Sequence, residues 1–153
     1  MTEALPEKLQ KVAEAYRGQV PVPVVAIAND LGLEIYETAD LEPNEAGFFR
    51  TEGDAFIVYL NSSHDLARQR FTVGSAIMWY LKRPHAVTEE GVVESTDQPI
   101  GHGRQAAALL MPELEFTEAW KATVGLEELA AQFEVPVGAA AIRGSDLFNV
   151  VRI

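Results

Sequence analysis

The side chains best suited to metal chemistry in this sequence are its three histidines, His64, His85 and His102. Three imidazoles suffice for a zinc site if they converge on one point. Their positions argue against convergence, because His64 starts a predicted helix and His85 lies beyond its end, about 30 Å away at a rise of about 1.5 Å per residue. We therefore expect surface or helix-capping roles for these imidazoles.

One metal site remains as an alternative, and it would lie near His102. The acidic residues available to it are Glu89, Glu90 and Glu94, which belong to a polar segment at residues 85–99 that we expect to be a loop. Imidazole and carboxylate ligands together can hold a zinc ion. In this alternative the chain is a metal-dependent hydrolase with a relocated site.

Nucleophilic catalysis has less support in the sequence. The chain contains no cysteine, which excludes a thiolate nucleophile, thiolate metal ligands and disulfides. Ser75 has no G-x-S-x-G elbow around it and no obvious base one helical turn away, so we interpret it as a small packing residue. The Gly-His-Gly-Arg string at residues 101–104 precedes a helix but follows no predicted strand, and it is weak evidence for phosphate binding.

The composition predicts one globular domain over residues 1–153, since 48% of the residues are apolar and 23% are charged. No run approaches the roughly 20 apolar residues that span a bilayer, and the acidic N-terminus differs from a signal peptide, so we expect a cytoplasmic protein without membrane contact. The formal net charge of −11, from 23 acidic and 12 basic residues, opposes direct binding to nucleic acid.

Two helices and a small sheet are predicted in the first sixty residues. Apolar residues recur first at helical spacing and then at the spacing of two that is typical of strands. The predicted helices cover residues 5–17 and 24–31, and the predicted strands cover residues 33–36, 47–50 and 55–60. Gly32 suits the end of the second helix, and a Thr-Glu-Gly-Asp turn joins the last two strands as a hairpin.

The remaining elements are predicted to be helical. Asn61, Ser62 and Ser63 offer N-caps for a long helix, and Pro84 ends it. The predicted helices cover residues 64–83, 104–111, 115–122, 126–133 and 137–147. The sequence therefore predicts an α+β fold, in which a small antiparallel sheet of about three strands packs against a mainly helical domain.

Four features occur in order between residues 40 and 147. They are a hairpin strand ending in Asn61, an Arg-Phe-Thr-Val string at residues 70–73, an Ala-Ala-Ala-Leu-Leu-Met-Pro string at residues 106–112, and a Leu-Ala-x-x-Phe-x-Val-Pro-x-x-Ala-Ala segment at residues 129–140. Each string is short, but their order and separation resemble the ImmA/IrrE-type metallopeptidases. The resemblance implies a zincin-like metallopeptidase domain.

In that family the Arg-Phe-Thr string leads, after two residues, into a His-Glu-x-x-His helix whose histidines hold zinc while the glutamate activates water. Counting from Arg70, the resemblance places these positions at Ser75, Ala76 and Trp79, and it places a third ligand, a glutamate, at Gly101. A serine hydroxyl is a poor zinc ligand, alanine and glycine have no donor, and an indole nitrogen has no free lone pair. The resemblance thus implies a degenerate member with no catalytic residue, no metal and no cofactor.

The family acts beside helix-turn-helix repressors, cutting or restraining them in response to stress or phage signals. For a member without the chemistry, the resemblance implies a pseudopeptidase that binds such a transcriptional regulator without cleaving it. We expect the indole of Trp79 to fill space that a metal and its water would need. The former substrate groove and the edge of the hairpin at residues 48–59 are the expected contact surfaces.

A different class of function is a structural subunit of a larger or homo-oligomeric assembly. A contiguous exposed patch of aromatic residues would indicate it, and the candidates are Phe48, Phe49, Phe56, Trp79 and Trp120. The last two predicted helices have the spacing of a helix-turn-helix, but their Gly-Ala-Ala-Ala-Ile-Arg string at residues 138–143 is small and apolar. We expect this string to pack against protein and not against DNA.

Overall fold

A computed structural model describes residues 4–82, 90–95 and 102–153, with only the backbone for residues 90–95. The helices are α1 (Glu7–Glu14), α2 (Val24–Leu31), α3 (Leu66–Lys82), α4 (Gly103–Leu110), α5 (Glu113–Ala122), α6 (Leu126–Phe133) and α7 (Val137–Phe148). The strands are β1 (Leu33–Thr38), β2 (Glu45–Glu52), β3 (Ala55–Asn61) and β4 (Glu90–Ser95). The predicted α+β class is confirmed.

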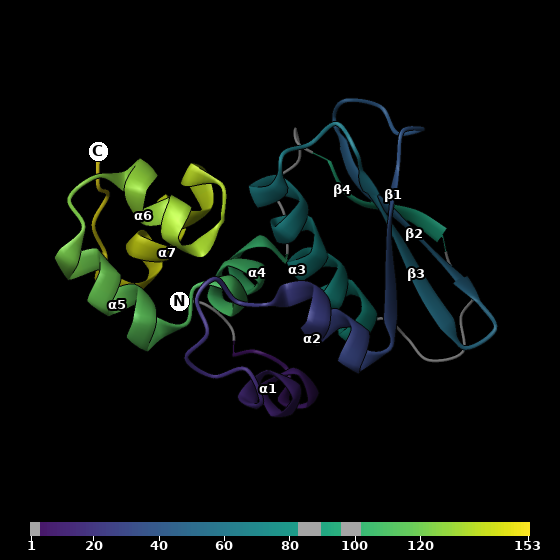
Figure 1. Cartoon of the computed structure of the whole chain (residues 1–153), viewed down its shortest axis with the longest axis horizontal. Helices are drawn as coiled ribbons and strands as arrows, with labels where there is room; N and C mark the ends of the chain where they lie inside the picture. The colour runs from purple at the N-terminus through teal and green to yellow at the C-terminus, as the bar shows by residue number, and fades with distance from the viewer. Residues whose placement is uncertain (1–3, 83–89, 96–101) are drawn as a thin grey trace.

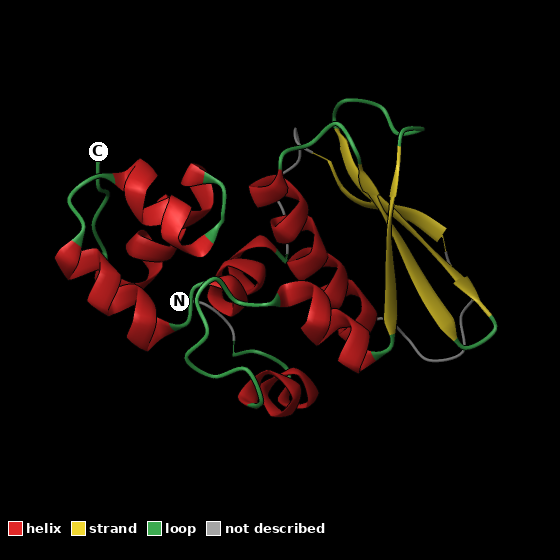
Figure 2. Cartoon of the chain, viewed as in Figure 1, coloured by secondary structure: helices red, strands yellow, loops and turns green. Residues whose placement is uncertain are grey.

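The sheet lies at one end of the molecule, and the described helices lie on one side of it (Figures 1 and 2). Its strand order is β1-β3-β2-β4. β1 runs parallel to β3, whereas the β2–β3 hairpin and the β2–β4 pair are antiparallel. The sheet is therefore mixed and four-stranded, and not antiparallel with about three strands.

Two predictions about this sheet were wrong. Residues 90–95 were expected within a polar loop, but they form β4, which is stabilised by pairing with β2. The Gly-Val-Val segment is too short to show the alternation that would predict a strand. The hairpin of β2 and β3 offers no free edge, since each of its strands has a neighbour on both sides. Among the described strands, the free edges belong to β1 and β4.

The side of the sheet that faces the helices is apolar. Phe49, Phe56 and Val58 are buried there, and Phe49 stacks on Phe56 with ring centroids 5.3 Å apart. Alternation places Tyr36 and Tyr59 on the opposite face, where their rings stack 5.8 Å apart and Tyr36 is half exposed. One face of the sheet thus forms part of the core, and the other meets solvent.

Helix α3 is the central element of the core. Asp65 accepts a hydrogen bond from the backbone N–H of Arg68 at 2.8 Å, which caps the helix, so the helix begins two residues after the predicted start at His64. All nine residues from Arg70 to Met78 are buried. A helix buried on every side must contact the sheet and other helices at once. It packs against β2, β3, α2 and α4.

The C-terminal helices form a second aromatic cluster. Phe116 of α5 lies 5.6 Å from Phe133 of α6 and 6.4 Å from Phe148 of α7, measured between ring centroids. Trp120 lies 4.9 Å from Phe148 by the same measure. Helix α4 connects this cluster to α3 through contacts with both α3 and α7. The described helices include none that is long and apolar enough to cross a membrane.

Candidate functional site

The predicted site residues of α3 lie on a fully buried stretch of helix. Ser75 and Ala76 have no exposed surface. The hydroxyl oxygen of Ser75 is buried and has no hydrogen-bond partner among the described residues. A nucleophilic serine needs a base in contact and access to a substrate. The surroundings of Ser75 therefore suit a packing residue.

Trp79 lies one turn further along α3, and its ring is packed between two others. Its centroid is 5.7 Å from that of Phe49 in β2, in a stacked arrangement, and 5.3 Å from that of His102, in an edge-to-face arrangement. These separations are those of favourable aromatic contacts. The indole thus bridges the sheet, the long helix and the start of α4.

Helices α3 and α4 approach each other closely just before this point. A Cβ atom added to Gly74 would lie 3.1 Å from the Cβ of Ala106. Larger side chains at these two positions would force the helices apart. The small residues Gly74 and Ala106 therefore allow the first part of α4, with His102 at its start, to pack closely against α3. The last predicted position, Gly101, lies outside the described residues.

The described residues do not fit the zinc ion that the family scaffold implies. Neither the buried serine hydroxyl of Ser75 nor the methyl group of Ala76 replaces an imidazole or a carboxylate, and the indole of Trp79 has no lone pair to donate. Within residues 4–82 and 102–153, whose side chains the structure describes, no three His, Cys, Asp or Glu side chains are grouped to hold a metal ion. The donor set at this position is therefore wrong for zinc.

The other histidines lie apart from one another. His64 precedes α3, and its Nε2 donates to the carbonyl oxygen of Pro43 at 2.9 Å, so it ties one loop to another. His102 is at the start of α4 against Trp79. His85 and Glu89 lie outside the described residues, and Glu90 and Glu94 belong to β4, for which only the backbone is described. The relocated metal site thus remains a hypothesis.

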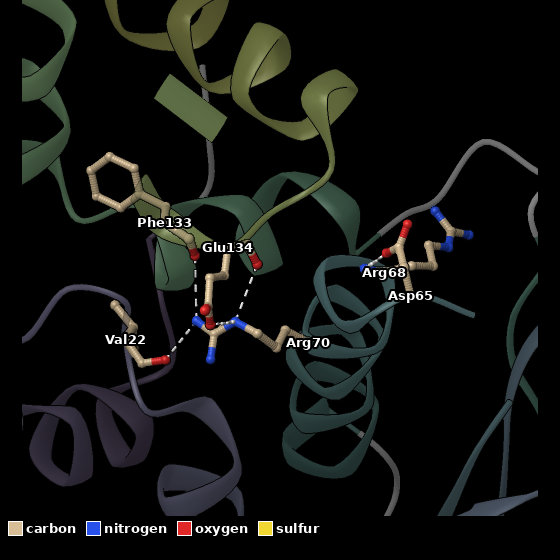
Figure 3. A network of polar contacts seen from close by, with 6 residues as sticks. All are labelled: Val22, Asp65, Arg68, Arg70, Phe133 and Glu134. Atoms are coloured by element: carbon tan, nitrogen blue, oxygen red, sulfur yellow. Dashed lines mark hydrogen bonds and ion pairs between the residues drawn. The ribbon is translucent and has the colours of Figure 1, made fainter. Parts of the chain in front are cut away.

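Arg70 has a role that sequence reasoning missed. Its guanidinium leaves α3 and points at the loop before α2 and at the end of α6 (Figure 3). Nη2 donates to the carbonyl of Val22 at 2.7 Å and to that of Phe133 at 3.4 Å, while Nε donates to the carbonyl of Glu134 at 3.1 Å. Burial lowers the pKa of Arg70, and the Glu134 carboxylate partly opposes this. Arg70 therefore joins three segments that are far apart in the sequence.

Asn61 has a similar structural role. Its side-chain nitrogen donates to the carbonyls of Glu42 at 3.0 Å and Glu45 at 2.9 Å, and its oxygen accepts from the backbone N–H of Ser63 at 2.9 Å. These bonds fix the loop before β2 to the end of β3. The available signal in the sequence was a polar Asn directly after a predicted strand. A polar side chain that becomes buried at such a position must find hydrogen-bond partners nearby.

The predicted packing of the last two helices agrees with the structure. Ala139, Ala140 and Arg143 of α7 are buried, and Arg143 donates from Nε to the carbonyl of Met111 at 2.9 Å. The other basic residue of this region, Arg152, lies 3.7 Å above the ring of Trp120. Neither arginine is placed as in a DNA-reading helix, where basic side chains project from the exposed face.

The five aromatic residues considered for an assembly surface do not form one patch. Phe49 and Phe56 are core residues with 5% and 1% of their surface exposed, whereas the partly buried Phe48 lies on the opposite face of the sheet, where it pairs with Tyr59. Trp120 belongs to the C-terminal cluster, whereas Trp79 packs against the sheet. These residues therefore supply no evidence for an oligomer interface.

The long buried helix with its Arg-Phe-Thr start, packed between a small mixed sheet and C-terminal helices, defines a metallopeptidase-like α+β domain. Comparison with family models agrees, because the family described as IrrE N-terminal-like domain matches residues 28–145. The chain belongs to this family, and the predicted ImmA/IrrE resemblance is confirmed. No curated protein matches the chain. Membership alone does not transmit an activity, since one fold can host many functions.

Proposed function

We propose that this chain is a catalytically inactive regulatory protein that binds a helix-turn-helix transcriptional regulator without cleaving it. The observation that carries the first half is the packing of Trp79 between Phe49 and His102, at the position predicted for a zinc-binding histidine. An indole there donates no ligand and takes up the room that a metal-bound water needs. The buried, non-basic neighbours Ser75 and Ala76 support the same proposal.

The proposed binding to a transcriptional regulator is supported by the partners of the family and by the negative net charge of this chain. Family members act beside helix-turn-helix repressors, and restraint of a repressor requires binding but no cleavage. The DNA-binding surface of such a repressor is basic, and this chain has a formal net charge of −11. Opposite charge favours encounter and correct orientation of the two proteins.

The free edge of β1 is the proposed contact. Its partner β3 occupies one side only, and Glu34 and Tyr36 of β1 are exposed. An extended segment of a partner could add to this edge through backbone hydrogen bonds, while Glu34 and Glu37 attract basic side chains. We therefore propose the edge of β1 as the contact surface in place of the hairpin edge expected from the sequence, because both hairpin strands have neighbouring strands on each side.

Metal content tests the first half of the proposal. We expect protein expressed with zinc, and purified without chelator or histidine tag, to contain far less than one metal ion per chain. The positive control restores the family residues through Ser75→His, Ala76→Glu, Trp79→His and Gly101→Glu, and we expect this variant to retain about one zinc. Stoichiometric metal in the unaltered chain would contradict the proposal and favour the site near His102.

Direct binding tests the second half. We expect purified helix-turn-helix regulators from the same genome to include one that binds the chain and keeps its intact mass after prolonged incubation. The charge-reversing change Glu34→Lys should weaken binding about tenfold or more, whereas Glu127→Lys on exposed α6 makes the same charge change elsewhere and should have little effect. Cleavage of the regulator, or equal effects of the two changes, would overturn this half.

A further inference from the structure

A second site lies at the C-terminal end of α4, whereas Trp79 contacts His102 at the start of that helix. There the structure has a cavity of about 550 Å³ between α1, the turn that leads to α2, and the junction of α4 and α5. Cavities of about 300–1,000 Å³ are the usual size of small-molecule sites. In Figure 1, α1 lies beside α2 and apart from the C-terminal helices. The cavity is distinct from the predicted position of the lost metal site.

The wall of the cavity is mostly apolar. Val22 and Leu109 are buried with 5% and 3% of their surface exposed, and Ile27 is completely buried. Leu5 and Ala13 line the cavity from the side of α1. Such a wall favours the apolar part of a ligand because contact removes both surfaces from water.

One buried cation reaches this cavity. Arg143 is 93% buried, as it exposes 7% of its surface, and it lines the cavity from α7. Its Nε donates to Met111, but the two terminal nitrogens have no hydrogen-bond acceptor among the described residues. A guanidinium with two free parallel donors suits a carboxylate, which accepts both. Burial lowers the pKa of Arg143, and the charges of Glu113 and Asp146 oppose this.

The first turn of α5 lines the same cavity and has no side-chain cap. The backbone N–H groups that begin a helix have no partner within it, and they favour a negative group nearby. The rim, however, is acidic on the side of α5, because Glu113 and Glu115 also line the cavity, whereas the Glu14 carboxylate on the side of α1 pairs with Arg17. These carboxylates disfavour a ligand that is only an anion and favour one that also carries a positive charge.

We propose that this cavity binds a short apolar peptide of two or three residues with free ends. The terminal carboxylate pairs with Arg143, the terminal ammonium pairs with Glu113 on the rim, and the side chains contact Val22 and Leu109. A peptide is favoured over a fatty acid, since only the peptide offers a cation to the acidic rim. The proposal is independent of the regulatory function, because it uses neither Trp79 nor the edge of β1.

Isothermal titration calorimetry with leucyl-leucine tests this proposal. We expect the free dipeptide to bind, and we expect N-acetylation or C-terminal amidation each to weaken binding about tenfold or more, since each removes one charge-assisted hydrogen-bonded pair. Decanoate, which has the carboxylate and an apolar chain but no ammonium, should bind more weakly than the dipeptide. Absence of dipeptide binding, or equal binding of decanoate or of either blocked peptide, would overturn the proposal.

Variants locate the site. Glu113→Gln should weaken binding of the free dipeptide about tenfold but leave that of the acetylated peptide unchanged, whereas Glu118→Gln, on the same helix but away from the cavity, should change neither. Ala108→Leu fills the cavity from α4 and should abolish binding while Arg143 stays in place. Arg143→Lys keeps the positive charge but removes the two parallel N–H donors of the guanidinium, so it should weaken binding of the free dipeptide. If Glu113→Gln and Ala108→Leu fold normally and bind as the unaltered chain does, the site is elsewhere and the proposal fails.

Discussion

At the scale of single residues, Arg70 of the family motif has a structural role, whereas the positions predicted for the family's chemistry hold apolar or small side chains. Arg70, from the Arg-Phe-Thr string, donates to three backbone carbonyls, whereas Ser75 and Ala76 are simply buried. A buried guanidinium that satisfies several carbonyls is costly to remove, because those carbonyls then lose their donors. The arginine of the Arg-Phe-Thr string is therefore needed for the fold, whether or not the chain catalyses a reaction.

This explanation makes a prediction for Arg70→Met, which keeps most of the side-chain volume. We expect the free energy of unfolding to fall by about 3 kcal/mol, because three buried or half-buried carbonyls lose a charged donor. Urea denaturation measures the change. Arg17→Met is the matched control, since Arg17 is exposed and pairs with Glu14, three residues earlier at the end of α1, and its effect should stay below about 0.5 kcal/mol. Similar effects of the two changes would contradict the role of Arg70.

At the scale of elements, the packing of α5 against α7 depends on a glycine. A Cβ on Gly144 would lie 2.7 Å from Cη2 of Trp120, which is less than real contacts allow. The indole cannot retreat easily, since the guanidinium of Arg152 lies 3.7 Å above it and donates to the carbonyl oxygens of Thr123 at 2.6 Å and Trp120 at 3.0 Å. The indole of Trp120 therefore lies against the backbone of α7 at a point where only a glycine leaves room for it.

For Gly144→Ala we expect a loss of about 1–3 kcal/mol in the free energy of unfolding, because an added methyl group overpacks this contact. Gly138→Ala provides the comparison on the same helix. A Cβ there meets nothing within 4 Å, so this change should stabilise the protein by up to about 1 kcal/mol through helix propensity. Thermal unfolding of the two variants should move in opposite directions. A stabilising Gly144→Ala would show that Trp120 moves freely.

The contact between the turn that follows α1 and helix α2 should depend on pH. The hydroxyl of Tyr16 donates to the carboxylate of Asp30, and this hydrogen bond raises the pKa of Tyr16 above its ordinary value of 10.0. The neutral phenol is thus favoured in the folded state. Its contribution to stability is present below pH 10.0 and is lost as the pH rises through the higher pKa of the folded protein.

We therefore expect the unaltered chain to lose more stability than Tyr16→Phe when the pH rises from about 8 to about 11, because only the unaltered chain loses this hydrogen bond on ionisation. Urea midpoints at both pH values measure the difference. Tyr36, whose pKa is raised by its hydrogen bond to Glu34, remains in both proteins and cancels in the comparison. Parallel losses in the two proteins would mean that the Tyr16–Asp30 bond contributes nothing.

Prediction from the sequence succeeded where local signals were strong and failed where the signal came from the tertiary structure. The helices over residues 24–31 and 126–133 were predicted to the residue, and Gly32 ends α2 with a positive φ of 102°. Strand β4 and the parallel β1–β3 pair were not predicted, because strand order depends on contacts between distant segments. The partners of Arg70 were missed for the same reason, since Val22 and Glu134 are far from it in the sequence.

At the scale of the whole molecule, the charge of −11 has a consequence for the proposed partner. If the chain binds the basic DNA-binding surface of a helix-turn-helix regulator, it occupies the surface that the operator DNA needs, so the two should compete. Both complexes depend on charge, and salt screens exposed charges over about 10 Å at about 0.1 M ionic strength. A complex held mainly by apolar contacts would show no such dependence.

We expect the association rate of the chain with its regulator to fall at least about tenfold between about 50 mM and about 500 mM salt, while the dissociation rate changes less, because long-range attraction acts mainly on encounter. Surface plasmon resonance measures both rates. Excess chain should also release the regulator from operator DNA in a mobility-shift experiment at low salt. A rate that is independent of salt, or a stable ternary complex with DNA, would place the contact away from the basic surface of the regulator.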